Sequence, residues 1–257
     1  MEKIFDSHSH YNGKSFRGDL DRVLRHIQRE GVGYAVNVGY DLESSNQALE
    51  MARANDFMYC AVGIHPDSAP DALDDGVMNE LRILAQNEKT VAIGESGLDY
   101  HYDDSPDREI QKQAFIRHIE LANEVGKPLI IHTRDAMKDT IDILTRHPLN
   151  SGVIHCYSGS RESAKQLVNM GFYIGFTGVI TFKNARRALE SMKVVPKDRL
   201  LIETDCPYMA PEPFRGKRCD SSLLNYTIQK MADELNMTKE EAIEMTAENA
   251  KRLFKIK

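Results

Sequence analysis

The chain has 257 residues, of which 41% are hydrophobic and 28% are charged. This balance allows a sizeable buried core and excludes a mainly disordered or collagen-like protein. Lysine and arginine number 33 against 39 aspartate and glutamate residues, so the net charge of -6 creates no overall positive field toward nucleic acid or an anionic membrane. A polyanionic substrate would therefore have to be bound by a local group of cations.

Short apolar runs rich in β-branched residues alternate with longer helical patterns along the whole chain, which is typical of repeated βα units. Eight such runs are predicted as strands, at residues 3–6, 34–38, 58–62, 90–94, 128–131, 152–155, 172–176 and 200–204. Eight strands, each followed by a helix or a helix-capable segment, predict a (β/α)8 TIM barrel of the α/β class, for which about 250 residues is a typical length. We expect residues 1–257 to form a single domain of this kind.

The helical segments carry recognisable start and stop signals. Residues 107–125 place apolar side chains at three- and four-residue intervals, as an amphipathic helix requires, and Gly126 is expected to end that helix. Beyond the last strand, residues 221–235 and 238–253 are predicted as further helices, the second beginning with a capping box. An open doubly wound sheet is an alternative, but no G-x-G-x-x-G follows the first strand, so dinucleotide binding lacks its main signal.

The cysteine pattern and the start of the chain suggest a location in the cell. Cys60, Cys156, Cys206 and Cys219 are widely spaced without a C-x-x-C pair, so we expect reduced thiols rather than disulfides or a structural zinc site. Residues 1–6 lack the apolar stretch of a signal peptide, and no run of 18 apolar residues is present to span a bilayer. We expect a cytoplasmic protein without membrane contact and without an obligate protein partner.

Metal-ligating residue types gather where the predicted strands end, and the carboxyl ends of the strands form the active site of this fold. Imidazole and carboxylate groups suit Zn²⁺, Mn²⁺ or similar ions. Six such donors exceed what one four-coordinate catalytic ion uses, so two divalent ions are predicted, with Glu95 on a middle strand as the natural bridge. The six candidate ligands are His8, His10, Glu95, His132, His155 and Asp205.

Strand side chains alternate with a period of two, which extends this prediction to neighbouring residues. Asp6, His8 and His10 are expected to share one face, and Glu203 is expected to share a face with Asp205. Asp6 and Glu203 are therefore candidates for residues that orient the ligating histidines.

A single histidine at a strand end is more often hydrogen-bonded or solvated than bound to a metal, and only the joint placement favours ligation. Four other histidines fall in helical or linker segments or just past a strand, and we expect them on the surface. They are His26, His101, His118 and His147.

Several residues are candidates for binding substrate. His65 ends the third strand in Gly63-Ile64-His65-Pro66, where it is either part of a rigid turn or a donor to substrate. The loop 211–218 carries three cations against one carboxylate, and loops after the last strands of this fold commonly bind phosphate. A short basic loop is usually solvated, but beside two metal ions it favours a phosphate-bearing substrate. The candidate phosphate-binding residues are His65, Arg134, Arg215, Lys217 and Arg218.

Six motifs, in order along the chain, resemble the TatD family of metal-dependent hydrolases. They are DSHSH at 6–10, GIHP at 63–66, GESGLDY at 94–100, IHTRDA at 131–136, HCYSG at 155–159 and ETDCPY at 203–208. The resemblance implies a metallo-dependent hydrolase of the amidohydrolase type, some of whose members are described as deoxyribonucleases, chiefly 3′ exonucleases, and others as D-aminoacyl-tRNA deacylases. It also implies that His8, His10, Glu95 and Asp205 bind one ion, and that Glu95, His132 and His155 bind the other. Cys219 and Asp220 depart from the family, whose members tend to have Asn-Glu or Asn-Ala there.

These features together predict a divalent-metal-dependent deoxyribonuclease that cleaves phosphodiester bonds from the ends of single-stranded DNA. Asp205 and Glu95 are the predicted catalytic residues, with Asp205 as the acceptor of a proton from the attacking water. The alternatives are a D-aminoacyl-tRNA deacylase and a small-molecule amide or ester hydrolase, the latter without need of the cationic loop. A non-enzymatic metal-dependent binding protein is less favoured, because so many ligands at an open site suit turnover better than a closed structural site.

Overall fold

The computed structural model describes residues 3–257, so Met1 and Glu2, where we expect no signal peptide, lie outside the described residues. Within 3–257, one sheet of eight strands has the same strand order as the chain. The strands are β1 (Ile4–Ser9), β2 (Val32–Val38), β3 (Met58–Val62), β4 (Thr90–Asp99), β5 (Leu129–Arg134), β6 (Gly152–Ile154), β7 (Tyr173–Phe176) and β8 (Leu200–Ile202).

A helix follows each strand, and one more ends the chain. The helices are α1 (Leu20–Arg29), α2 (Leu42–Ala54), α3 (Asp75–Ala85), α4 (Arg108–Val125), α5 (Met137–Arg146), α6 (Arg161–Asn169), α7 (Arg186–Met192), α8 (Leu224–Leu235) and α9 (Lys239–Phe254). Short 3-10 turns are η1 (Lys14–Phe16), η2 (Pro66–Leu73), η3 (Gly178–Thr181), η4 (Lys197–Arg199) and η5 (Ser221–Leu223). Eight consecutive βα units in chain order place the protein in the (β/α)8 TIM-barrel class, as predicted.

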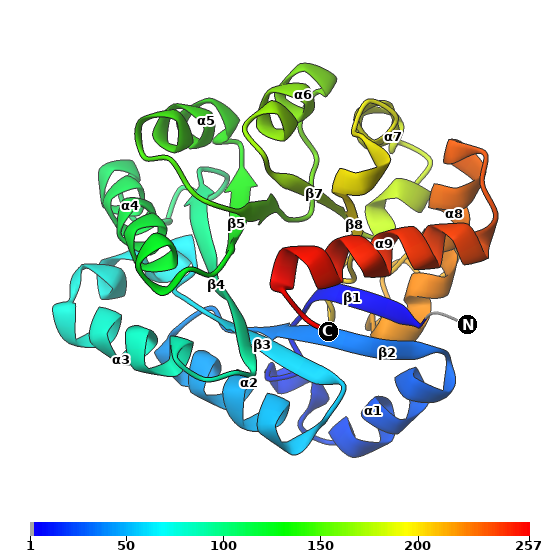
Figure 1. Ribbon diagram of the computed structural model, residues 1–257, viewed down its shortest axis with the longest axis horizontal. Helices are drawn as coiled ribbons and strands as arrows, with labels where there is room; N and C mark the ends of the chain where they lie inside the picture. The colour runs from blue at the N-terminus through cyan, green and yellow to red at the C-terminus, as the bar shows by residue number, and fades with distance from the viewer. Residues whose placement is uncertain (1–2) are drawn as a thin grey trace. The chain divides into compact units, whose positions relative to one another are not determined.

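The chain divides into two compact units, one made of the segment up to Val36 with Cys156–Lys257, the other of Asn37–His155. The prediction of a single domain over 1–257 therefore stays a prediction. In the second unit β3, β4, β5 and β6 pair in parallel, and α2 and α4 pack on β3 and β4. Figure 1 shows α2, α3, α4 and α5 along one side of these strands.

The first unit brings together the two ends of the chain. β7 pairs in parallel with β8, and β8 contacts β1. The backbone N–H of Asp205 donates to the carbonyl of His8 at 2.9 Å, which ties the segment after β8 to β1. α9 packs on both β1 and β8, and Figure 1 shows it next to β1.

Local signals explain where the main helices begin and end. The Asp107 side chain accepts the Glu109 N–H at the start of α4, and Gly126, with a left-handed φ of 67°, ends that helix. Thr238 and Glu241 form the predicted capping box of α9. Within residues 3–257, no helix is long and apolar enough to cross a membrane.

β4 runs further than predicted and positions much of the site. It was expected to end at residue 94, but it continues to Asp99 and pairs Gly97 with His132 on β5. A side chain at Gly97, where φ is 148°, would meet the His132 carbonyl oxygen at 2.0 Å, so only glycine allows the two strands to approach here. All ten residues of β4 are buried, as is usual for a parallel strand covered on both faces.

β8 is shorter than predicted and ends at Ile202. Asp205 lies beyond the strand with a left-handed φ of 57°. The expectation that Glu203 and Asp205 share a strand face is therefore wrong, because the alternation of side chains holds only within an extended strand.

Candidate metal centre

Three predicted ligands of the second unit lie in mutual contact. The Glu95 Oε1 atom is 2.9 Å from His132 Nδ1 and 2.7 Å from His155 Nε2, and these two nitrogens are 3.2 Å apart. Glu95 and His155 are each only 4% exposed. A buried carboxylate and two imidazoles at this spacing form a set of three donors for one divalent ion.

Asp99 sets the orientation of His132, a role that the sequence analysis missed. Its Oδ2 lies 2.9 Å from His132 Nε2, and its Oδ1 accepts the His101 backbone N–H. Burial raises the pKa of Asp99, but the hydrogen bonds from His132 and His101 outweigh it, and the pKa lies below the ordinary 3.8. The ionised Asp99 accepts the Nε2 proton of His132, which leaves the Nδ1 lone pair directed at Glu95 and His155.

His65 lies beside the same three residues. Its Nε2 is 3.8 Å from Glu95 Oε1, and its ring stacks edge-on against His132 with 4.7 Å between centroids. Its Nδ1 lies 3.2 Å from the Asp67 backbone nitrogen and 3.3 Å from Asp67 Oδ2, so Asp67 fixes the orientation of the ring. His65, Glu95 and His132 also place one ligand atom each within 4.8 Å of one another.

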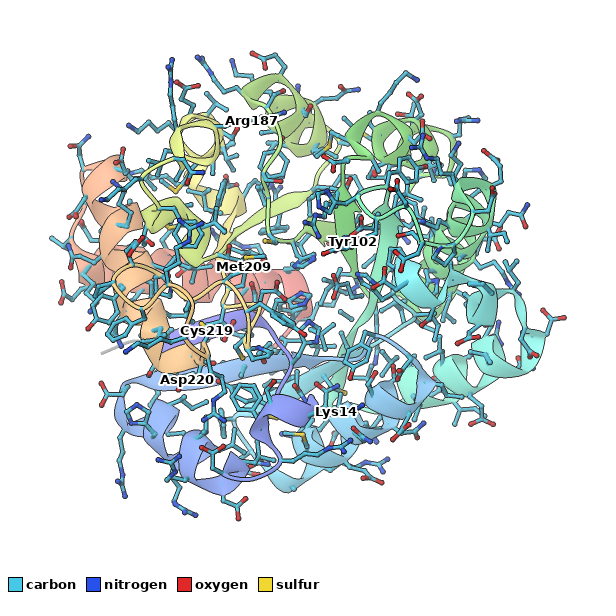
Figure 2. All side chains as sticks on the ribbon, turned by 180° about the vertical axis from the view of Figure 1, so that it is seen from behind. Lys14, Tyr102, Arg187, Met209, Cys219 and Asp220 are labelled. Atoms are coloured by element: carbon cyan, nitrogen blue, oxygen red, sulfur yellow. The ribbon has the colours of Figure 1, made fainter. Side chains whose placement is uncertain are left out.

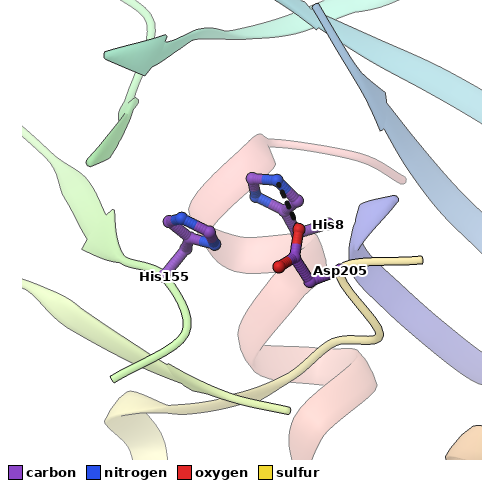
Figure 3. A group of neighbouring side chains, drawn as sticks. All are labelled: His8, His155 and Asp205. Carbon is purple, nitrogen blue, oxygen red and sulfur yellow. Dashed lines mark ion pairs between the residues drawn. The ribbon is translucent and has the colours of Figure 1, made fainter. Parts of the chain in front are cut away.

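Three further predicted ligands come together in the first unit. His8 Nε2 and His10 Nε2 are 3.0 Å apart, and Asp205 Oδ1 lies 3.7 Å from the former and 3.4 Å from the latter. Figure 3 marks the ion pair between His8 and Asp205 with a dashed line. His8 lies on β1, and His10 is the first residue after the strand, so the predicted alternation along a strand does not extend to His10. The 3.0 Å contact between the two rings nevertheless brings both imidazoles to one place.

Asp6 holds the backbone around these ligands. Its carboxylate accepts the backbone N–H groups of His8 and Thr204, and the hydroxyls of Thr204 and Ser221 at 2.6 Å each. Burial raises the pKa of Asp6 to about 6 in spite of these bonds. Asp6 therefore bonds the backbone of His8 and not its ring. Its predicted role in orienting a ligating imidazole stays a prediction.

Glu203 joins two strand ends. It accepts the Ser7 hydroxyl at 3.2 Å and the backbone N–H of Cys156, the residue after His155. These bonds restrain the main chain next to His155 and His8. Its predicted role in orienting histidines likewise stays a prediction.

Both clusters fit divalent ions by the chemistry of their donors. Neutral imidazole lone pairs and carboxylate oxygens at 2.7–3.2 Å repel one another unless a proton or a cation lies between them. Burial lowers the pKa of His132, but the bonds with Asp99 and Glu95 raise it by more, so it lies above the ordinary 6.5. The Glu95 cluster thus attracts positive charge, which is what a metal ion supplies.

Comparisons with known proteins agree with this chemistry. A family model described as TatD related DNase matches residues 5–255. The chain belongs to the TatD family. YabD of Bacillus subtilis (strain 168), named an uncharacterized metal-dependent hydrolase, is 45% identical to it over 255 residues, covering 98% of this chain and 99% of YabD.

Two other relatives add detail to the TatD assignment. The protein named 3′-5′ ssDNA/RNA exonuclease TatD of Erwinia tasmaniensis is 33% identical over 261 residues, covering 98% of this chain and 100% of that protein. The crystal structure of YjjV, a TatD homologue from Escherichia coli K12, matches with a TM-score of 0.92 at 28% identity, covering 99% and 98% of the two chains. This TatD-family protein is a metal-dependent hydrolase with a TIM-barrel fold.

The predicted phosphate-binding cations of this TatD-family chain differ in their surroundings. Arg218 donates to both carboxylate oxygens of Asp19 at 2.8 Å and to the Ser15 carbonyl, and its guanidinium lowers the pKa of Asp19 to about 2. Arg215 lies over the Phe182 ring, and Lys217 is exposed. Arg218 thus already has a carboxylate partner, while Arg215 and Lys217 form no ion pair with another residue in 3–257.

His118 is not on the surface, contrary to expectation. It is fully buried on α4, where its Nδ1 donates to the Ala114 carbonyl and its Nε2 accepts the Ile64 N–H at 3.0 Å. The amphipathic pattern of α4 already placed it next to buried residues, but the pairing with Ile64 spans 54 positions and has no local signal. The other three histidines stay at least partly exposed as predicted.

Proposed function

We propose that this TatD-family hydrolase is a nuclease that removes nucleotides from the ends of single-stranded DNA with two divalent ions. The observation that carries the proposal is the pair of three-donor clusters, one of His8, His10 and Asp205, the other of Glu95, His132 and His155. We propose that Glu95 serves both ions, as the sequence predicts. Zn²⁺, Mn²⁺ or Mg²⁺ would suit these donors. The printed name of the Erwinia relative supports the nuclease class.

The two ions, when bound, lower the pKa of water toward neutrality and offset negative charge on phosphate oxygens. Asp205 is the acceptor for the proton of the attacking water, because its side chain is 13% exposed while those of Glu95 and Asp99 are 5% and 4% exposed. Glu95 supplies the buried negative charge between two imidazoles. An amide at this position would keep the shape and lose that charge.

The cations and His65 place the phosphate of the substrate. His65 places its Nε2 atom 3.8 Å from Glu95 Oε1, and Arg134 follows His132 by two residues on β5. Arg215 and Lys217 add exposed positive charge after β8. Because the net charge is -6, this local group acts on a strand end better than on long duplex DNA, whose binding depends on many phosphate contacts.

The test is an assay of the metal-reconstituted full chain on end-labelled single-stranded DNA, single-stranded RNA, circular single-stranded DNA, D-aminoacyl-tRNA, and carboxylic esters and amides. We expect stepwise shortening of linear strands from the 3′ end and no cleavage of circular DNA. Glu95→Gln should lose most of this activity and remain folded. Hydrolysis confined to D-aminoacyl-tRNA or to small esters and amides would replace the nuclease proposal with that activity.

A further inference from the structure

One exposed aromatic ring lies next to the Glu95 cluster. Tyr102, labelled in Figure 2, is on the loop that follows β4 and is 53% exposed. It lies three positions along the chain from Asp99, which bonds His132 at 2.9 Å, and three positions span at most about 10 Å. A single exposed aromatic ring is ordinary on a protein surface, so what distinguishes Tyr102 is the set of residues around it.

Tyr102 is held by a cation from the neighbouring strand. The Arg134 guanidinium lies over the ring at 5.0 Å from its centroid, and it donates to the Tyr102 hydroxyl at 3.1 Å. The His101 ring packs edge-on against Tyr102, with 4.9 Å between centroids, and His101 is itself fixed by an ion pair with Asp135 at 2.9 Å. The ring is therefore oriented before any ligand binds.

Arg134 keeps its charge available. Among residues 3–257 it forms no ion pair with a carboxylate, in contrast to Arg218 with its Asp19 partner. The backbone of Arg134 is fixed by the β4–β5 ladder, where it pairs with Asp99 and its carbonyl accepts the Tyr100 N–H at 2.9 Å. An oriented aromatic face beside a guanidinium that forms no ion pair matches a base and the phosphate attached to it.

We propose that Tyr102 and Arg134 form a stacking platform for one base of the substrate strand, with Arg134 also neutralising the adjacent phosphate. The inference rests on the proposed nuclease function and deepens it, because it assigns recognition of a base to a hydrolase whose predicted contacts are all to phosphate. Stacking on an aromatic face tolerates any base, so the platform selects an unpaired nucleotide rather than a sequence.

Other exposed apolar side chains lack one of these features. Tyr208 is 64% exposed, but no cation lies over its ring among the described residues, and Ile83 is 63% exposed without a π-face. A protein partner is a weaker fit to Tyr102, because binding there would cover the loop next to a catalytic cluster that has to admit substrate.

The test compares Tyr102→Ala with Tyr102→Phe and with Tyr59→Ala in the metal-loaded full chain. Tyr59 is the matched control, because Lys89 lies over its ring at 4.9 Å and it sits near the amino end of β3, away from the carboxyl ends. The substrates are linear single-stranded DNA with normal bases and the same strand with abasic sugars at its 3′ end.

Tyr102→Ala should raise KM for the normal strand by about 5- to 150-fold with kcat nearly unchanged, the range expected for one stacked base. Tyr102→Phe should stay close to wild type because the ring remains, and Tyr59→Ala should leave KM unchanged. On the abasic strand, wild type and Tyr102→Ala should have the same raised KM. The strand has lost the base that stacks on Tyr102, so removing the ring as well has no further effect, as in a double-mutant cycle.

Binding provides a readout that does not depend on turnover. A phosphorothioate strand carrying 2-aminopurine near its 3′ end should lose fluorescence on binding wild type and Tyr102→Phe, and should keep it with Tyr102→Ala. The stacking platform would be overturned if wild type had the same KM for normal and abasic strands and Tyr102→Ala had the KM of wild type. The nuclease function would remain intact in that case. Failure of wild type to cleave any strand would instead overturn the proposed function.

Discussion

At the scale of single residues, the contact between Asp99 and His132 shows how one carboxylate orients a predicted metal ligand. The His132 Nε2–H donates to Asp99, so Nδ1 is the nitrogen that faces Glu95 Oε1 at 2.9 Å and His155 Nε2 at 3.2 Å. Partners of this kind fix both the tautomer and the ring orientation of a ligating histidine. Asp99 is 3% exposed, so its charge acts in a medium with little water.

We predict that Asp99→Asn lowers the metal affinity by about 10- to 100-fold, the usual effect of losing such a partner. The amide oxygen can accept from only one of the two donors that now bond Asp99, His132 Nε2–H and the His101 backbone N–H. The amide NH2 group would face the other donor. The measurement is competition for metal against a chelating dye. Asp135→Asn is the matched control, because Asp135 forms an exposed pair with His101 at 2.9 Å. Equal affinities for Asp99→Asn and Asp135→Asn would contradict the role of Asp99.

The cations after β8 separate into a structural and an exposed group. Arg218 ties the loop to Asp19 through two hydrogen bonds and lies over the Phe16 ring, whereas the exposed Lys217 forms no ion pair within residues 3–257. We predict that Arg218→Ala and Asp19→Asn each lower the thermal midpoint, while Lys217→Ala leaves it unchanged. Lys217→Ala should weaken binding of single-stranded DNA and reduce the salt dependence by about one unit of slope. A midpoint that falls equally in Lys217→Ala and Arg218→Ala would refute the distinction.

At the scale of elements, α4 supports the turn that carries His65. His118 on α4 accepts the Ile64 N–H, which holds the residue before His65 in place. Burial lowers the pKa of His118 to about 4 from its ordinary 6.5. The contact therefore needs the neutral imidazole, because a protonated ring has no lone pair to accept with.

The pKa of His118 predicts an acid-sensitive contribution to stability. The folded value is lower than the unfolded value, so the unfolded state takes up the proton first as pH falls. The contribution is complete above pH 6.5 and declines toward pH 4, by about 3 kcal/mol for a shift of this size. His118→Gln removes the titration, so its unfolding free energy should change less than that of wild type over this range.

Urea unfolding at several pH values measures this difference. His26→Gln is the control, because the His26 side chain is 51% exposed on α1. A pH profile for His118→Gln that runs parallel to wild type would show that His118 does not titrate as proposed.

At the scale of the whole molecule, the two donor clusters decide how the stability of the protein depends on metal. Each cluster concentrates carboxylates and imidazoles that lose their mutual repulsion when a cation binds. An ion that binds only the folded state also stabilises it, by about 4 kcal/mol at a thousand times its dissociation constant.

We predict that chelation abolishes hydrolysis, lowers the thermal midpoint, and is reversed on both counts by a divalent ion. Metal analysis after gentle purification should find up to two ions per chain. Activity that persists in a rigorously metal-free sample would contradict the proposed mechanism outright.

The sequence by itself determined the eight βα units and the residues that form both donor clusters. Both follow from local information, because strands and helices have different apolar periods and the carboxyl ends of parallel strands lie at the same edge. The C-terminal end of α4 and the capping box of α9 could likewise be predicted from the sequence, since each depends on residues within one turn. The resemblance to the family added the prediction that these residues divide between two ions.

Only the tertiary structure decided which side chains support the ligands. Asp99 meets His132 across 33 positions, His118 meets Ile64 across 54, and Arg218 meets Asp19 across 199. The extent of β4 was also hidden, because two glycines within it suggest a turn until β5 is seen to approach at Gly97. Such contacts depend on how strands and helices pack against one another, and no periodicity or spacing within a segment specifies that packing.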